Sequence, residues 1–176
     1  KNKNIIRAKE TFIELFDNNI NKYTIVSNTA TSLNEVKNII LEGNVELRLK
    51  SNQDLMMTSD ILKWDLSNST IVLEKNPSIK SKNIEIDSKL VKLNLLSNQI
   101  SFEGNSTMNV NHSADNSFTE ISFSEAVWDI DTGDLSSFHK VLGSKNFNQK
   151  RLYNFSAQSL EGNTNNEFMN LKECII

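Results

Sequence analysis

One unit of alternating apolar and polar residues recurs along this chain at intervals of about 30 residues, which is typical of a repeat architecture. The clearest copy, residues 59–76, contains Leu62, Trp64 and Leu66 with polar residues between them, which is the period of a half-buried strand. Ser67–Thr70 then favour a turn, and a second apolar stretch follows directly. The unit therefore predicts a β-hairpin.

The same unit is found again on both sides of this copy. It matches residues 27–44, which begin 32 residues earlier, and residues 88–105, which end 29 residues later, without a gap. Trp128-Asp129-Ile130 lies 64 residues after Trp64-Asp65-Leu66. A single hairpin cannot bury its apolar face, whereas stacked hairpins can. The repeats therefore predict an all-β sandwich, roll or solenoid.

The segments outside the clear repeats are less regular. Residues 5–16 fit either one face of a helix or a strand, and the β-prone Thr11–Phe16 before an Asn-rich turn favour the strand. Residues 111–117 and 143–150 are polar and predict loops. We expect about thirteen to sixteen short strands and no helix.

Composition narrows the classes of partner. The net charge is −3, with charges of both signs mixed and no basic patch, which does not favour a nucleic-acid partner. Cys174 is the only cysteine, so an internal disulfide is excluded. No apolar run approaches the ~18 residues of a membrane helix. Because the chain begins with Lys1 rather than Met, we expect a processed form from which a signal or anchor was removed.

A group of acidic residues near Asp131 has two chemical interpretations. Asp131-Thr132-Gly133 matches the core triplet of aspartic proteases, in which two such carboxylates share a proton. Asp129, Asp131 and Asp134 superficially resemble a calcium-binding loop, although the glycine comes one position early. The triplet falls where the repeat requires a hairpin turn, so we interpret it as a turn.

The histidines and tryptophans indicate neither a metal site nor a sugar-binding site. His112 and His139 have no partner at metal-ligand spacing, so we expect surface histidines and no metal site. Trp64 and Trp128 are in phase with inward-facing strand residues, which favours core packing over stacking on sugars. No motif for a nucleotide or another cofactor is present, so we expect none.

The strand motifs themselves resemble a known family. They are Tyr23-x-Ile25-x-Ser27-x-x-Ala30, Ile39-Ile40-Leu41-Glu42-Gly43-Asn44-Val45, Thr58-Ser59-Asp60-x-Leu62-x-Trp64-Asp65 and Ile100-x-Phe102-x-Gly104-Asn105. This pattern resembles the periplasmic lipopolysaccharide-transport family that includes LptA, LptC and the OstA-like domain, and its layout is most like LptC. The resemblance implies one domain over residues 1–176, with the clearest repeats in 11–110 and a weaker C-terminal extension in 118–176.

The resemblance further implies a twisted β-jelly roll, open like a folded slab, whose apolar interior holds acyl chains of lipopolysaccharide or a related glycolipid. Such a protein transports lipid and is not an enzyme. The residues expected to line this interior are Val45, Leu47, Leu49, Leu62, Trp64, Leu66, Ile84, Ile86, Val91, Leu93, Leu95, Ile100, Phe102, Met108, Phe123 and Trp128.

The resemblance also implies partners at the two ends of the slab. Exposed edge strands invite strand addition, and the edge residues expected to take part are Phe12, Glu14, Phe168 and Leu171. The implied partners are an LptA-like bridge protein, the inner-membrane lipopolysaccharide ABC transporter, and a second copy joined head to tail. The implied location is the periplasm, with an inner-membrane anchor absent from this sequence.

Two other classes remain open from the residues alone. A structural or adhesive β-repeat protein predicts a filled, dry core without a ligand. A retroviral-protease-like hydrolase predicts an obligate dimer with two facing copies of Asp131.

Overall fold

The computed structural model describes residues 5–17, 19–33, 37–50, 55–112, 117–148, 150–166 and 168–176. Within these residues the chain forms fifteen strands and no helix, as the repeats predict. The strands are β1 (Ile5–Asp17), β2 (Ile20–Leu33), β3 (Asn38–Leu49), β4 (Leu55–Asp65), β5 (Thr70–Glu74), β6 (Ser78–Ser81), β7 (Ile84–Asp87), β8 (Leu90–Asn94), β9 (Gln99–His112), β10 (Ser117–Asp129), β11 (Asp134–Ser137), β12 (Val141–Phe147), β13 (Lys150–Ala157), β14 (Ser159–Asn163) and β15 (Phe168–Lys172).

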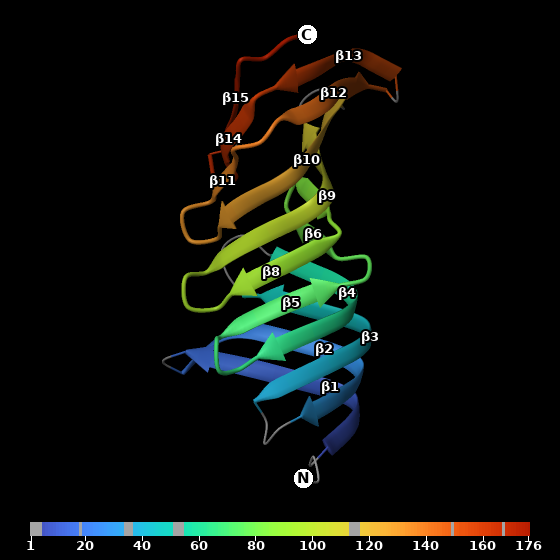
Figure 1. The fold of residues 1–176 in the computed structure, drawn as a ribbon, viewed down its shortest axis with the longest axis vertical. Coiled ribbons are helices and arrows are strands. Elements are labelled where there is room, and N and C mark those ends of the chain that lie inside the picture. The colour runs from blue at the N-terminus through green and yellow to red at the C-terminus, as the bar shows by residue number, and fades with distance from the viewer. Residues whose placement is uncertain are drawn as a thin grey trace.

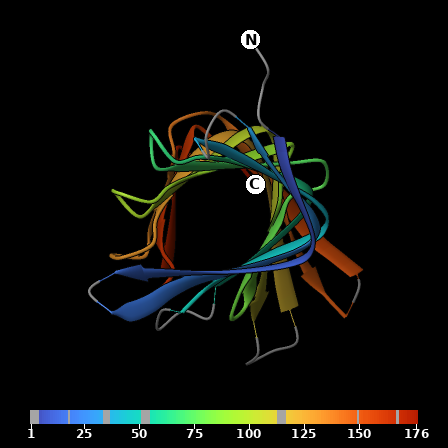
Figure 2. The same cartoon turned by 90° about the horizontal axis from the view of Figure 1, so that it is seen from below.

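All fifteen strands belong to one antiparallel sheet that folds over on itself into two walls (Figures 1 and 2). The long strands cross both walls, as β4 shows: its residues 61–65 pair with β5, and its residues 56–58 pair with β6. In β9, residues 99–103 pair with β8 and residues 107–110 pair with β7. We call the wall that contains β5, β8, β11, β14 and β15 wall A, and the wall that contains β6, β7, β12 and β13 wall B. This architecture is the predicted β-jelly roll.

A buried serine marks the bend between the walls in three repeats. The hydroxyls of Ser27, Ser59 and Ser88 each donate to the carbonyl two residues further along, at 2.9–3.0 Å. The register of β2 and β3 shifts at the first of these bends. Because a bend interrupts the ladder, the hydroxyl supplies a hydrogen bond that the neighbouring strand does not.

Hairpin turns lie along the free margin of wall A, the side opposite the bends, and they share one hydrogen-bonding pattern. Asp65 accepts hydrogen bonds from the backbone N–H groups two and three residues later, at 2.9 and 3.2 Å. Asn94, Asp129 and Asn163 accept the equivalent pair in the three turns that follow on this wall. Side chains of this kind stabilise tight turns. The turns predicted after Asp65 and at Asp131–Gly133 are thereby confirmed.

One segment predicted as a loop is instead largely strand. Residues 143–150 lie mostly in β12 and at the start of β13. Buried Ser144 and Asn146 bond to each other, so polar residues occupy inward positions here. A prediction based on apolar alternation therefore missed this strand. Of the other predicted loop, 111–117, residues 113–116 lie outside the described part of the chain, while β9 continues to His112 and β10 begins at Ser117.

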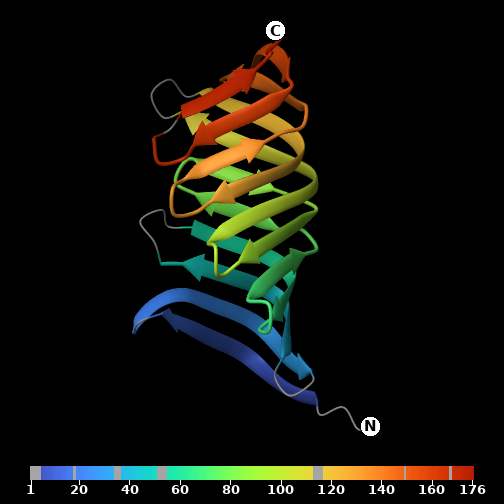
Figure 3. The same ribbon diagram turned by 60° about the vertical axis from the view of Figure 1, so that its left-hand side comes forward.

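The first and the last described strands lie at opposite ends of the roll. Figure 3 shows the long β1–β2 hairpin at one end and β14 and β15 at the other. The strand predicted for Thr11–Phe16 is part of β1. The roll is therefore elongated, with its walls running between two dissimilar ends.

Candidate functional site

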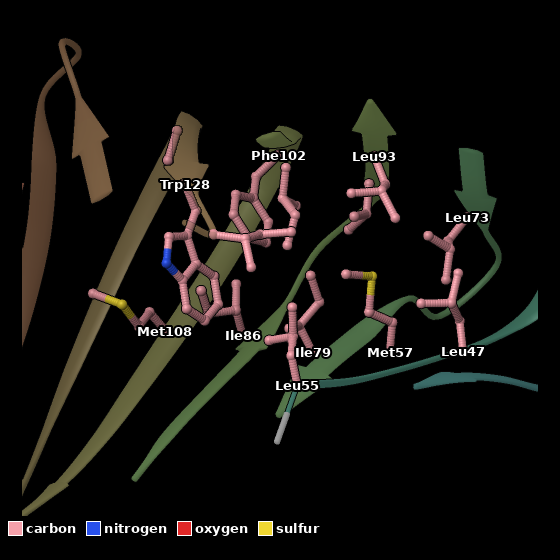
Figure 4. Close-up of a cluster of buried hydrophobic side chains, with 14 of the residues drawn as sticks. Leu47, Leu55, Met57, Leu73, Ile79, Ile86, Leu93, Phe102, Met108 and Trp128 are labelled. Carbon is pink, nitrogen blue, oxygen red and sulfur yellow. The ribbon is translucent and has the colours of Figure 1, made fainter. Parts of the chain in front are cut away.

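The space between the walls is filled with apolar side chains over most of its length. Leu47, Leu93 and Trp128 are completely buried, and Figure 4 shows the row of side chains that fills the gap. Phe102 and Phe123 meet edge to face, with ring centroids 6.0 Å apart and an interplanar angle of 84°. The middle of the interior is thus a packed core.

The structure places thirteen of the sixteen predicted interior residues in this core. Ile84 and Leu95 are half-buried and pack against it. The thirteen are Val45, Leu47, Leu49, Leu62, Trp64, Ile86, Val91, Leu93, Ile100, Phe102, Met108, Phe123 and Trp128.

Leu66 is the exception, because its side chain is exposed. Strand β4 ends at Asp65, whose carboxylate holds the next residues in a turn. The sequence prediction extended the strand alternation past Asp65 and therefore placed Leu66 in the interior, which was wrong.

The packing opens into a cavity toward the C-terminal end. This seam cavity has a volume of about 550 Å³ and lies between the free margins of the two walls. Ile84, Met108 and Val110 of wall B line its floor together with Leu135 and Met169 of wall A. Figure 4 shows Met108 beside Trp128 at the end of the packed row, so the cavity begins where the core stops.

A second cavity of about 260 Å³ continues toward β12, β13 and the C-terminal residues. It shares His112 and Met169 with the seam cavity, so the two spaces adjoin. Apolar Ile121, Phe155 and Leu171 also line it. Together the cavities make one continuous space toward the C-terminal end of the roll.

Polar side chains form the rim of the seam cavity. Lys82, Asn83 and Asn111 approach from wall B, and Asn163 and Thr164 from wall A. The result is an amphipathic space, with apolar atoms below and polar atoms at its mouth.

The two histidines differ in their surroundings. His112 is half-buried at this rim, with its Nε2 atom 2.9 Å from the Thr119 hydroxyl, so the prediction of a surface histidine was wrong for it. The strand that carries His112 runs further than the polar sequence indicated, which places the side chain on the inner face. His139 is exposed and lies 3.2 Å from Glu125.

A chain of hydrogen bonds joins the two walls at their margins. The Tyr23 hydroxyl on β2 donates to Asn98 Oδ1 at 2.8 Å, and Asn98 Nδ2 donates to both carboxylate oxygens of Asp131, at 3.0 and 3.2 Å. Burial, followed by the negative charge of Asp131, raises the pKa of Tyr23 to about 12. We call this chain the margin latch; the exposed Asp131 carboxylate serves it within a hairpin turn.

Comparison with known proteins identifies the family. The family model described as "Lipopolysaccharide-assembly, LptC-related" matches residues 1–111. The chain belongs to this family.

A solved structure is similar in fold to this LptC-related chain. It is LptH of Pseudomonas aeruginosa, described as the LptA-homologous periplasmic component of the conserved lipopolysaccharide transport device. The TM-score is 0.55 at 11% identity, over 68% of this chain and 82% of that one. The likeness supports the jelly-roll fold. No curated protein matches the sequence. Within its described residues, the LptC-related chain contains no helix able to span a membrane.

The edge strands of this LptC-related roll lie at its two ends. Strand β1 pairs only with β2 among the described strands, and Phe12 and Glu14 are exposed on it. At the other end β15 pairs with β14; its Phe168 is 48% exposed, whereas Leu171 is half-buried against the core. Sequence reasoning predicted these two edges but missed β13. This strand pairs with β12 on one side and, on the other, is bridged to the chain only at Ser156, which exchanges backbone hydrogen bonds with Ile175 at 2.8 and 2.9 Å, so most of the described β13 forms a second C-terminal edge.

Sequence reasoning also missed the rim and the latch. Lys82 follows a short strand and carries no pattern of its own, and Tyr23 lies 75 residues before Asn98. The repeat of Asp or Asn at the wall A turns was a usable signal, because Asp65 and Asp129 align directly.

Proposed function

We propose that this chain binds acyl chains of lipopolysaccharide or a related glycolipid between its walls and passes them from the inner-membrane transporter toward the outer membrane. The observation that carries this proposal is the seam cavity, with its apolar floor, in a member of a lipopolysaccharide-assembly family. The proposed location is the periplasm, with an anchor to the inner membrane in a segment outside this sequence.

The cavity matches an acyl chain in chemistry and in size. Each buried CH₂ group stabilises the complex by about 0.8 kcal/mol. A volume of about 550 Å³ falls within the ordinary range of ligand cavities, about 300–1,000 Å³. Part of a multi-chain lipid fits without rearrangement, and further chains require the packed walls around Leu47 and Leu93 to separate.

Two buried hydrogen-bond donors favour a ligand that brings a polar group into the interior. The indole Nε1 atoms of Trp64 and Trp128 are buried without an acceptor among the described residues. A buried donor left unpaired costs about 1–3 kcal/mol. An ester or amide carbonyl on an entering lipid would accept these hydrogen bonds, whereas a permanently filled core gains nothing from them.

The edges supply the proposed route of transfer. An LptA-like bridge protein or the transporter would add a strand to β1, β13 or β15, and a second copy would join head to tail by the same contacts. Phe12 and Phe168, both exposed, would supply side-chain contacts at such junctions.

Site-specific photocrosslinking tests the binding site. A photoreactive phenylalanine derivative replaces Met169, which lines the seam cavity, and in a matched control replaces Leu142, which is 53% exposed. After irradiation with lipopolysaccharide, we expect a crosslinked band from the first variant and little from the second. Equal labelling of both, or of neither, with unchanged circular dichroism would contradict the proposal.

A structural β-repeat protein without a ligand is the second candidate. The packed middle of the interior favours it, because residues such as Leu62 and Phe102 leave no room between the walls. Native mass spectrometry with added lipopolysaccharide separates the two candidates. A bound lipid supports transport, and a folded protein without lipid at every concentration supports the structural role.

A further inference from the structure

We infer that the seam cavity holds its acyl chain in one orientation, with an anionic headgroup, a phosphate or a carboxylate, bound at Lys82. The inference rests on the proposed function, since it assigns the polar end of the ligand whose apolar end the cavity takes.

The charge distribution around the cavity carries the inference. None of the described residues that line it bears a carboxylate, although the chain as a whole has a net charge of −3. Lys82 is the lysine among them, and it lies at the mouth with Asn83, whose amide nitrogen donates to the Asn111 carbonyl at 3.3 Å. A cation without a neighbouring carboxylate favours an anion over a neutral or positive group.

Lys82 also differs from lysines that have partners elsewhere on the roll. Four lysines on the strands each contact a glutamate across a strand pair, at 2.6–2.8 Å. Among the described residues, no carboxylate lies within ion-pair distance of Lys82. The paired lysines are Lys63, Lys80, Lys92 and Lys172. The charge of Lys82 is therefore available to a ligand.

The position of the floor fixes the orientation of the chain. Met108 and Leu135 lie beneath the rim, and the packed core begins beyond Met108 at Trp128. A tail that enters between the margins therefore points toward the core, and its headgroup remains at the Lys82 side, in contact with water. Burying the charged group at the Met108 end would leave the charge without a partner and is strongly disfavoured.

Isothermal titration calorimetry with single-chain amphiphiles below their micelle concentration tests this site. The probes are dodecyl phosphate, dodecanoate and the uncharged dodecyl maltoside. The variants are Lys82→Glu and, as a matched control, Lys75→Glu. Both lysines are exposed turn residues with positive φ, 45° and 58°, but Lys75 does not line the cavity.

We expect the wild type to bind at least one anionic probe about tenfold more tightly than the maltoside, which corresponds to one charge contact near the surface. Lys82→Glu should remove this preference and leave maltoside binding unchanged, whereas Lys75→Glu should keep it. Tighter binding of the phosphate than of the carboxylate, or the reverse, identifies the headgroup. If all three probes bind equally, or if both variants lose the preference alike, the inference at Lys82 is wrong while acyl binding stands. If no probe binds to the folded protein, the proposed function fails as well.

Discussion

The margin latch gives a stability difference that changes sign with pH. Replacing Tyr23 by Phe removes the hydroxyl that donates to Asn98 at 2.8 Å and leaves the buried ring in place. A typical hydrogen bond contributes about 0.5–1.5 kcal/mol net. At pH 8 we therefore expect Tyr23→Phe to lower the free energy of unfolding by about 1 kcal/mol, or the melting temperature by about 2–4 °C.

Alkaline pH reverses this difference because the folded state holds the phenol proton more tightly. The pKa of Tyr23 is about 12 in the fold, against about 10 in the unfolded chain. The stabilisation is fully present below pH 10 and is lost as pH rises through 12. The wild type loses about 1 kcal/mol by pH 11 and about 2 kcal/mol by pH 12 through this group, and the Phe variant loses none.

Urea denaturation followed by tryptophan fluorescence at pH 8, 10, 11 and 12 measures the effect. The deficit of Tyr23→Phe should vanish near pH 11 and become a gain by pH 12. Tyr153→Phe is the control, since Tyr153 is 43% exposed on β13 and takes no part in the margin latch. A constant deficit for Tyr23→Phe at every pH would refute the argument that burial and Asp131 disfavour the ionised phenol.

Two further substitutions test the packing of the roll by thermal and urea denaturation. Phe102→Ala should destabilise by about 3–5 kcal/mol because it empties a core site, while Leu96→Ala, at an 81% exposed position, should stay within about 0.5 kcal/mol; similar values for the two would contradict the packed interior. Gly143→Ala should cost about 1–3 kcal/mol, since its Cβ would lie 2.2 Å from the Phe155 ring and 2.7 Å from the Glu120 carbonyl oxygen; partial recovery of stability by Phe155→Leu in the double variant would support the ring's share of this cost.

The strand pattern was predictable because its information is local. The alternation around Trp64 fixes a strand and the polar residues after Asp65 fix its turn, so the hairpin repeat follows without tertiary knowledge. Trp128 follows Trp64 into the core for the same reason. The prediction stopped being correct at Leu66, where a turn replaces the strand.

The candidate site was less predictable because it depends on contacts between distant segments. Whether the walls touch or separate is decided by side-chain volumes across the interior, where Leu47 and Leu93 are completely buried. The cavity lies among irregular C-terminal strands, where Ser144 and Asn146 break the apolar alternation. Lys82 stands out only in the fold, where none of the described residues that line the cavity with it bears a carboxylate.

The bends at Ser27, Ser59 and Ser88 form a hinge along one side of the roll, about which the two walls can separate. Strands such as β4 and β9 run through the bend into both walls, so the sheet is continuous along this side of the roll. The hydrogen bonds between neighbouring strands lie within each wall and do not connect wall A to wall B across the interior. Separating the two walls therefore breaks apolar contacts and the margin latch at Tyr23 but few hydrogen bonds between strands. Exposing the apolar surface costs a free energy of about 25 cal/mol for each Å². In the proposed lipid complex, an acyl chain between the walls would replace those apolar contacts, so the walls would separate as each chain enters and close again when it leaves.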